Sequence, residues 1–305
     1  LGASKAKNAL LDIYKLRLGL SATPKRWFDE AGTQYIYDYF GDVIFEFSIK
    51  DALSNIDPIT GKTYLVPYYY YPISINLTEN ELLDYYEYTK KITKMSFSNE
   101  NKEFEEIIKL LSIHRANIHK NAANKIPEFE KLIKKIDDLS GTILFVSGEH
   151  QISDSQRILD KYNITYHKFT EDEGTKSQAE YGGLSERGFL LKKFKEQELK
   201  ILIAIKCLDE GVDIPNAICA ILLASSTNPR EYIQRIGRVI RPSKNKDFAY
   251  IYDFIVVPSQ TQFDPVFREL ENKLFSKEMI RVSEIAQNAI NNAEALKSLQ
   301  GFQGS

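Results

Sequence analysis

The sequence predicts an α/β fold in which a parallel sheet is flanked by helices and preceded by a helical connector. Between residues 140 and 260, short apolar runs alternate with helical segments and are joined by short loops. Strands that alternate with helices in this way form parallel sheets with helices on both faces. Apolar residues at helical spacing between 78 and 139 indicate the connector.

The expected strands of the sheet are short apolar runs at 143–146, 164–169, 200–205, 218–223 and 247–252. Further strands are expected nearer the start of the chain, at 16–20, 43–49 and 64–77. Between the strands, Ser153 is expected to cap one helix and a second helix begins near Ser185. Asn228 and Pro229 are expected to cap a third helix that continues through Arg241.

The connector is expected to contain three helices. Thr78 and Glu81 have the spacing of a capping box at the start of the first helix. Phe104 and Ile107 belong to an apolar repeat on the second helix, and Pro127 suits the first turn of the third. From about residue 262, the chain is expected to be a polar helical tail whose last residues are disordered.

The composition is that of a globular protein without a strong charge bias. The chain has 305 residues, which suggests about two domains, and its net charge is -2. No overall positive field therefore indicates nucleic acid, although a motor protein needs only one positive groove. The apolar runs are too short to cross a membrane, so no membrane partner is expected.

Cysteine usage indicates a reducing setting. Cys207 and Cys219 are the two cysteines, they form no Cys-x-x-Cys pair, and the four histidines are scattered. A zinc site is therefore not expected, and no metal-ligating residue is assigned in this chain. Together these features favour an intracellular, cytoplasmic location.

The most informative segment is residues 234–241, which bring three polar groups together. On a helix, Gln234, Arg238 and Arg241 share one face because they are spaced by four and then three positions. Planar cations held on a packed helix suit a polyphosphate whose charge develops during phosphoryl transfer. On spacing alone, a solvated basic face of a helix is the more common explanation.

Residues 208–215 follow an expected strand and contain a second candidate site. Gly211 allows the backbone to approach a ligand closely, and Asp213 can accept hydrogen bonds from ribose hydroxyls. An ordinary turn with solvated carboxylates would contain the same residue types, so the neighbouring segments have to distinguish the two interpretations.

Five segments, taken in order, resemble the sequence motifs of superfamily 2 helicases. They are Ser-Ala-Thr-Pro at 21–24, Ile-Leu-Phe-Val-Ser at 143–147, Gly-Gly-Leu-Ser-Glu-Arg at 182–187, Asp-Glu-Gly-Val-Asp-Ile-Pro at 209–215 and Gln-Arg-Ile-Gly-Arg-Val-Ile-Arg-Pro at 234–242. Each segment alone is a weak or moderate signal, but five in order are a strong one. The last two look most like the branch of type III restriction subunits and excision-repair helicases, which have a DExH-type acidic motif.

This resemblance implies a RecA-like domain at 140–260, followed by the helical tail at 261–305. Before it, residues 1–77 would be the remnant of a first RecA-like domain and residues 78–139 the helical connector. The implied activity is that of a helicase or translocase that couples ATP hydrolysis to movement along nucleic acid. The expected cofactors are ATP and Mg²⁺, and the expected partner is double-stranded DNA.

The resemblance also assigns roles around the nucleotide. Arg238 and Arg241 would be arginine fingers, and Gln234 would face the nucleotide. Gly211 and Asp213 would line its ribose and phosphates.

A second group of residues would serve the nucleic-acid track. Ser21 and Thr23 would couple the nucleotide state to that track, and contacts to the phosphate backbone would come from Ser147, Gly148 and Gly183. Where many relatives have threonine, this chain has Ile205, whose side chain cannot donate to a phosphate. The strand contact at that point therefore either passes to Lys206 or is absent.

The phosphate-binding loop and the acidic motif of these enzymes are expected to be missing. Residues 61–63 end like a phosphate-binding loop, but Ile56 stands where its first glycine would be. Residues 209–210 could pass for a Mg²⁺-binding pair, yet the residues after them fit the helicase motif better. We expect the Mg²⁺ ligands upstream of Leu1, in a missing N-terminal domain or a partner subunit, and no ATP hydrolysis by this chain alone.

Two alternatives stay open on the sequence. A non-catalytic module that binds nucleic acid or protein could keep this fold, although it would have no need of Gln234, Arg238 and Arg241 together. An RNA helicase would differ from a DNA translocase mainly in its substrate. The tyrosines at 68–71 could stack bases, but burial of alternate rings on the two faces of a strand is the more common arrangement.

Overall fold

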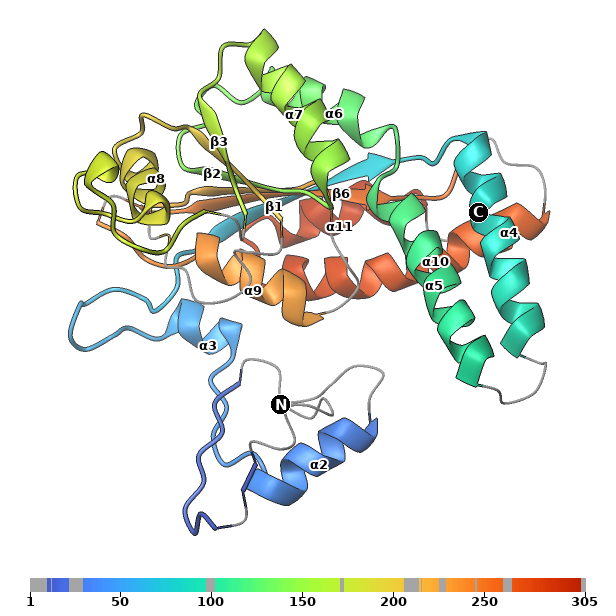
Figure 1. The fold of residues 1–305 in the computed structure, drawn as a ribbon, viewed down its shortest axis with the longest axis horizontal. Coiled ribbons are helices and arrows are strands. Elements are labelled where there is room, and N and C mark those ends of the chain that lie inside the picture. Colours follow the sequence, from blue (N-terminus) through green and yellow to red (C-terminus); the bar gives the residue numbers. More distant parts are fainter. Residues whose placement is uncertain are drawn as a thin grey trace.

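A six-stranded parallel sheet forms the centre of the molecule in the computed structural model (Figure 1). The structure describes residues 10–11, 13–21, 30–96, 102–170, 173–205, 214, 216–224, 229–244, 246–259 and 265–302. The strand order is β1-β6-β5-β2-β4-β3, and every neighbouring pair is parallel. The strands are β1 Tyr68–Ile75, β2 Thr142–Phe145, β3 Tyr166–Phe169, β4 Ile201–Ala204, β5 Cys219–Leu222 and β6 Ala249–Val256. The predicted α/β class and the strands of its sheet are confirmed.

Helices cover both faces of the sheet because both faces are apolar. On β2, Ile143 and Phe145 face one core and Leu144 faces the other, together with Val146 just after the strand, and all four are buried. Strands buried on both sides read as continuous apolar runs, which is why these runs were visible in the sequence. The first core is closed by α8 Glu186–Lys195, α9 Pro229–Val239, α10 Pro265–Ala286 and α11 Asn292–Gln300, and the second by α6 Lys125–Ile133 and α7 Glu149–Lys161.

The connector consists of α4 Glu79–Ser96, α5 Lys102–Lys120 and α6, as the spacing of apolar residues predicted. Its first helix begins with the expected capping box. The Thr78 amide donates to Glu81 Oε2 at 2.8 Å, and the Glu81 amide donates to Thr78 Oγ1 at 3.3 Å. Glu81 Oε1 also accepts from the Ala123 amide at 2.8 Å, so the start of α4 is tied to the turn between α5 and α6. Figure 1 shows α4 and α5 as a hairpin at one side of the sheet.

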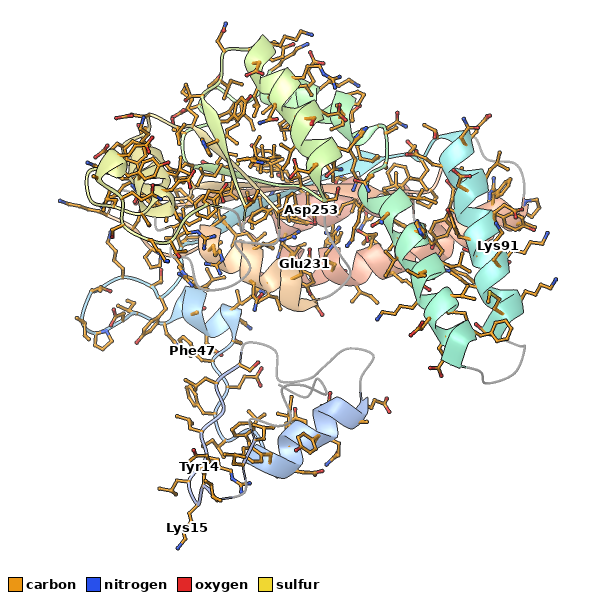
Figure 2. The ribbon with its side chains drawn as sticks, viewed as in Figure 1. Tyr14, Lys15, Phe47, Lys91, Glu231 and Asp253 are labelled. Atoms are coloured by element: carbon orange, nitrogen blue, oxygen red, sulfur yellow. The ribbon has the colours of Figure 1, made fainter. Side chains whose placement is uncertain are left out.

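The predictions of strands at 16–20 and 43–49 are wrong. The first segment has no regular structure, and the second has none before α3 Ile49–Ser54 begins. Leu16 is 94% exposed and Ile44 is 92% exposed. A strand needs a partner for its backbone groups, and neither segment has one among the described residues. Together with α2 Glu30–Phe40 they form the part that lies apart from the sheet, where Tyr14, Lys15 and Phe47 are labelled (Figures 1 and 2).

Two helix boundaries differ from the predicted ones. Helix α7 begins at Glu149 with Gly148 as its N-cap residue, so Ser153 lies within the helix instead of capping it. Helix α9 ends at Val239, two residues before Arg241. The expected start of α8 is confirmed, because the Ser185 side chain accepts from the Gly188 amide at 3.1 Å.

The polar tail is more closely packed than predicted. Val282 of α10 and Leu299 of α11 are fully buried in the first core. On the outer edge of β1, the Tyr70 amide donates to Asn291 Oδ1 at 2.9 Å, and Asn291 Nδ2 donates to the Tyr70 carbonyl at 3.0 Å. The tail therefore satisfies part of an edge strand that would otherwise expose unpaired backbone groups. The last residues, 303–305, lie outside the described part of the chain.

Strand β1 connects the expected domains. It pairs with β6 along its whole length, from Tyr68 opposite Ala249 to Ile75 opposite Val256. Residues 68–75 therefore belong to the same sheet as the strands between residues 142 and 256. The predicted domain limit at residue 77 separates β1 from those strands in sequence. The domain limits at 77, 139 and 260 stay predictions.

The tyrosine run alternates between the two faces of β1. Tyr68 and Tyr70 are buried in the first core, whereas Tyr69 and Tyr71 lie on the opposite face. There the Tyr69 ring stacks on Tyr250 at 5.7 Å between centroids, and the Tyr71 ring stacks on Tyr252 at 5.1 Å. Because these rings stack on one another, the run is explained by packing of the sheet.

No helix within the described ranges has both the length and the apolar character needed to cross a bilayer.

Candidate nucleotide-contacting site

Several of the predicted site residues follow the carboxyl ends of neighbouring strands. Ser147 and Gly148 come directly after β2, and Lys206, Gly211 and Asp213 follow β4, which is paired with β2. The carboxyl ends of parallel strands meet at one edge of a sheet, where ligands of open α/β proteins commonly bind. Lys206, Gly211 and Asp213 themselves lie outside the described residues, so their side chains are not placed.

The three residues predicted to face the nucleotide occupy different environments. Gln234 is half-buried on α9, and Arg238, one turn later on the same helix, is only 5% exposed. Arg241 is exposed and follows the end of the helix. The structure thus places Gln234 and Arg238 on one helical face as predicted, but the position of Arg241 depends on how the chain leaves α9.

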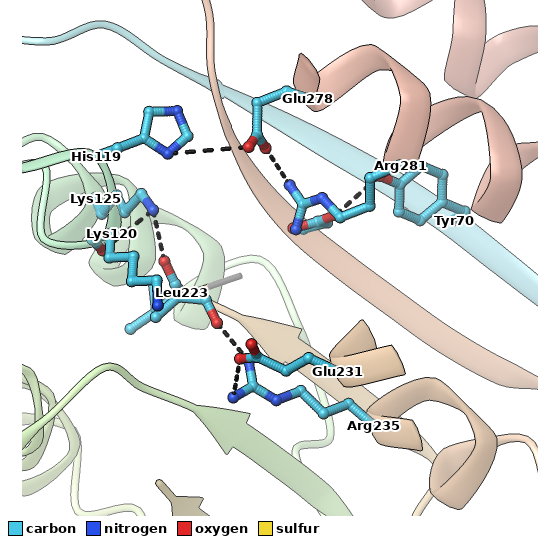
Figure 3. Close-up of polar contacts among 11 residues, drawn as sticks. Tyr70, His119, Lys120, Lys125, Leu223, Glu231, Arg235, Glu278 and Arg281 are labelled. Carbon is cyan, nitrogen blue, oxygen red and sulfur yellow. Dashed lines mark hydrogen bonds and ion pairs between the residues drawn. The ribbon is translucent and has the colours of Figure 1, made fainter. Parts of the chain in front are cut away.

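Arg235 holds α9 against the sheet, a role that the sequence interpretation missed. Its guanidinium is 3% exposed, donates from Nη1 to the Ala224 carbonyl at 2.6 Å and pairs through Nη2 with Glu231 Oε1 at 2.6 Å (Figure 3). It also lies 5.1 Å from the centroid of the Phe145 ring. The spacing of Glu231 and Arg235 by four positions was a signal for this pair, because such residues are neighbours on a helix.

Lys125 contacts the same end of β5 from the opposite side of the sheet. Its side chain is buried at the start of α6, and Nζ donates to the Leu223 carbonyl at 2.8 Å and to the Lys120 carbonyl at 3.2 Å (Figure 3). Burial lowers the pKa of Lys125 to about 8. No local sequence pattern could reveal this contact, because its acceptor is a backbone oxygen of a distant segment.

Two consecutive carbonyls, of Leu223 and Ala224, are therefore held by buried cations from different helices. These carbonyls lie immediately after β5, and residues 225–228 then lead into α9. The backbone just after β5 is thus held by a side chain of α6 on one side and by a side chain of α9 on the other.

A buried ionic network joins side chains of α5, β1, β6 and α10. Arg281 Nη1 lies 3.2 Å from Asp253 Oδ1, and Arg281 Nη2 forms a short contact with Glu278 Oε2. Tyr70 donates its hydroxyl to Asp253 Oδ2 at 3.0 Å, and His119 Nδ1 lies 3.9 Å from Glu278 Oε1. Burial raises the pKa of Asp253 and lowers that of His119 well below its usual value. Figure 3 shows this network beside the two cations that hold the exit of β5.

Ser147 makes contacts within the chain. Its amide donates to Gln151 Oε1 at 2.9 Å, and its hydroxyl forms a short hydrogen bond with Asn121 Oδ1. A phosphate bound by the Ser147 amide would have to displace the Gln151 side chain. Gly148 has no side chain and nothing packs within 4 Å of the position a Cβ would take, so it leaves room at the start of α7.

Gly183 lies in a turn before α8, after a short 3-10 helix, Ala179–Tyr181. Its φ of +84° is a conformation that glycine adopts without strain. Arg187, at the start of α8, donates from Nη2 to the Thr170 carbonyl at 3.1 Å, which holds this turn near the carboxyl end of β3. Gly148 therefore follows β2, and Arg187 of α8 contacts the residue after β3, with β4 between these two strands in the sheet.

The predicted coupling residues are placed only in part. Ser21 is exposed in the segment that lies apart from the sheet, and Thr23 is outside the described residues. Within the described part of the chain, no group of three His, Cys, Asp or Glu side chains is arranged to hold a metal ion.

Comparisons with known proteins relate the chain to helicases. Residues 124–243 match the family model of the helicase conserved C-terminal domain. The chain is 26% identical over 253 residues to a DNA 3'-5' translocase, XPB2, of Sulfurisphaera tokodaii, covering 77% of this chain and 52% of that protein. It is 28% identical over 260 residues to putative helicase 22 of a Sulfolobus islandicus filamentous virus, covering 83% of this chain and 40% of that protein.

Among solved structures, the C-terminal part of the Fun30 ATPase domain aligns with a TM-score of 0.45 at 14% identity, covering 71% of this chain and 99% of that one. The chain spans about half the length or less of the two sequence relatives. The matched region, 124–243, contains β2 to β5 and α9, which are the elements that position the candidate site. Residues 124–243, which include most of this parallel sheet, are therefore similar to the helicase conserved C-terminal domain.

Proposed function

We propose that this chain is the C-terminal portion of an ATP-dependent helicase or translocase that acts on double-stranded DNA. In this proposal Arg238 and Arg241 are arginine fingers, and Gln234 contacts the nucleotide. Gly211 and Asp213 line its ribose and phosphates. The activity depends on a second domain that binds the phosphates of ATP, because arginine fingers stabilise charge on a phosphate that another part of the protein holds.

The observation that carries the proposal is the rigid attachment of α9. Its core side, including Ile236 and Val239, is buried in the first core, and Arg235 fastens it to the exit of β5. A helix held in this way presents Gln234 and Arg238 in a defined geometry. Preorganised cations are effective in catalysis because they need no rearrangement when charge develops.

The choice of DNA rests on the relatives. The relative with 77% coverage of this chain is named a DNA translocase, whereas the matches to proteins named RNA helicases cover between 22% and 64% of it. We propose that the backbone of the DNA is contacted by Gly148, Gly183 and Lys206, with Ser147 beside them. Ser21 and Thr23 would couple this track to the nucleotide.

The cofactors in this proposal are ATP and Mg²⁺. We place the Mg²⁺ ligands and the phosphate-binding loop outside these 305 residues, so that the chain alone does not hydrolyse ATP. The small number of cysteines, Cys207 and Cys219, supports a reducing, cytoplasmic setting in this proposal. Turnover by the 305-residue chain that requires Mg²⁺ and DNA would contradict this division of the site.

The test is the DNA-stimulated ATPase activity of the longer protein that includes a phosphate-binding loop. Arg241→Ala should lower kcat by about 10²-fold or more, because a guanidinium that stabilises the transferring phosphoryl group would be lost. The exposed Arg157→Ala on α7 is a matched control and should keep wild-type turnover.

Other outcomes would identify the alternatives. Stimulation by RNA but not by DNA would make the protein an RNA helicase. A longer protein without ATPase activity in the presence of either nucleic acid would favour a non-catalytic binding module.

A further inference from the structure

Three consecutive backbone carbonyls at the end of α9 are each bound by a donor from another segment. The carbonyls of Val239 and Arg241 both accept from Nζ of Lys246, the second at 2.8 Å. The Ile240 carbonyl between them accepts from the Val66 amide at 2.8 Å. The chain that carries Arg241 is therefore held on both sides as it leaves the helix.

Such an arrangement has a specific physical basis. The last carbonyls of a helix have no partner within it and carry partial negative charge, which a cation stabilises. Lys246 is only 5% exposed, and its burial lowers the pKa of the ammonium to about 8. Burying an ammonium is costly unless it is hydrogen-bonded, and here the two carbonyl oxygens provide that bonding.

The position of this contact matters because Arg241 lies outside α9. A residue within a helix is oriented by the helix itself, as Gln234 and Arg238 are. Arg241 follows the last helical residue, Val239, so its direction depends on the backbone of residues 239–241. Lys246 contacts that backbone on both sides of Ile240.

We propose that Lys246 is a positioning residue for Arg241, which it orients by holding the carbonyl oxygens of Val239 and Arg241. This proposal rests on the proposed function, because it assigns Lys246 to the same phosphoryl-transfer site. Lys246 touches neither ATP nor nucleic acid in this role. It acts through the backbone of the arginine finger.

The test uses the longer, ATP-hydrolysing protein with Lys246→Met, Lys246→Arg and the control Lys244→Met. Methionine keeps the length of the side chain but cannot donate, whereas arginine keeps a charged donor. Lys244 lies in the same loop with an exposed side chain. DNA-stimulated kcat, KM for ATP and DNA binding would be measured for each variant. Amide hydrogen exchange would follow residues 238–243.

We expect Lys246→Met to lower kcat by about 10- to 100-fold, since a small displacement of a catalytic group has effects of this size. KM for ATP and DNA affinity should stay within about threefold, because Lys246 contacts neither ligand and its loss removes no ground-state binding interaction. Exchange should rise in residues 238–243. Lys246→Arg should recover most of the lost kcat, and Lys244→Met should match the wild type.

A pH profile supplies a readout that a merely structural role would not change. As the pH rises through about 8, the Lys246 ammonium loses its proton and its charge, which weakens its hydrogen bonds to the two carbonyls, so kcat should fall above that pH. Lys246→Arg keeps its charge throughout this range and should not show the fall.

Two results would overturn the proposal in distinguishable ways. An active wild type whose kcat is unchanged by Lys246→Met, with only the melting temperature altered, would leave the proposed function intact and reduce Lys246 to a structural cap. A wild type without ATPase activity would overturn the proposed function, and the positioning role with it.

Discussion

Buried cations fasten the backbone around the candidate site. Arg235, Lys125 and Lys246 each donate to main-chain carbonyls at the point where a strand or helix ends. At such points the carbonyls would otherwise be left without partners in a dry environment. Basic side chains are therefore expected to contact phosphate at this site, and other basic side chains hold the backbone around it.

Arg235 offers a direct measurement of this effect. Arg235→Met should lower the free energy of unfolding by about 2–4 kcal/mol, because the Ala224 carbonyl and the largely buried Glu231 both lose a charged partner. Urea denaturation of the chain would measure it. Arg157→Met is the matched control, since Arg157 pairs with Asp154 at 2.7 Å but is 77% exposed. Its loss should change stability by less than about 0.5 kcal/mol, as exposed pairs contribute little. Equal effects of the two variants would contradict the structural role of Arg235.

At the scale of elements, local sequence patterns predicted that a helix would form more accurately than they predicted the residue at which it begins or ends. The start of α8 was predicted near Ser185, and the structure confirms it, because the Ser185 side chain caps the helix by accepting from the Gly188 amide. The start of α7 was not, because Ser153 looks like a cap although the helix already begins at Glu149. Gln151, which is 2% exposed, accepts from the Ser147 amide and occupies the position where the chain leaves β2. That contact cannot be recognised from the residue type alone.

The two serines give a paired test of these boundaries. Ser185→Ala should destabilise the protein by about 1 kcal/mol, because the Gly188 amide loses its acceptor. Ser153→Ala should be neutral or slightly stabilising, since an exposed alanine within a helix is favourable. Thermal or urea unfolding of both variants would show the difference. A larger loss for Ser153→Ala would mean that α7 begins where the sequence suggested.

At the scale of the whole molecule, buried charges join parts of the chain that are distant in sequence. Arg281 on α10 pairs with Asp253 on β6, and Tyr70 on β1 donates to the same carboxylate. Asp253 and Arg281 are 0% and 1% exposed, respectively. The network thus ties the tail to the sheet at the strands nearest one edge (Figure 3).

Replacing Arg281 alone should lower the free energy of unfolding more than replacing Arg281 and Asp253 together. Arg281→Met should destabilise the protein by about 3–5 kcal/mol, because the carboxylate of Asp253 would be left buried without its partner. Adding Asp253→Asn should recover part of that loss, since the uncompensated charge disappears. A double-mutant cycle in urea would measure the coupling. Additive effects would indicate that the two side chains do not interact as the structure places them.

The candidate site was predictable to the extent that its residues lie in one continuous segment. Gln234, Arg238 and Arg241 could be proposed as site residues because their spacing and neighbours form a local pattern. Lys125 and Lys246 were missed, because a lysine that donates to a distant carbonyl has no signature in the sequence. Burial of a cation, the property that marks both residues, exists only after the chain has folded.

The alternation of apolar runs with helical segments was enough to predict a parallel sheet covered on both faces, because local periodicity follows the geometry of helices and strands. Strand order, the pairing of β1 with β6 and the packing of the tail could not be read in this way, since they depend on contacts between distant residues. The same reason explains residues 16–20 and 43–49. Their apolar pattern resembles that of strands, but a strand forms only where another backbone pairs with it.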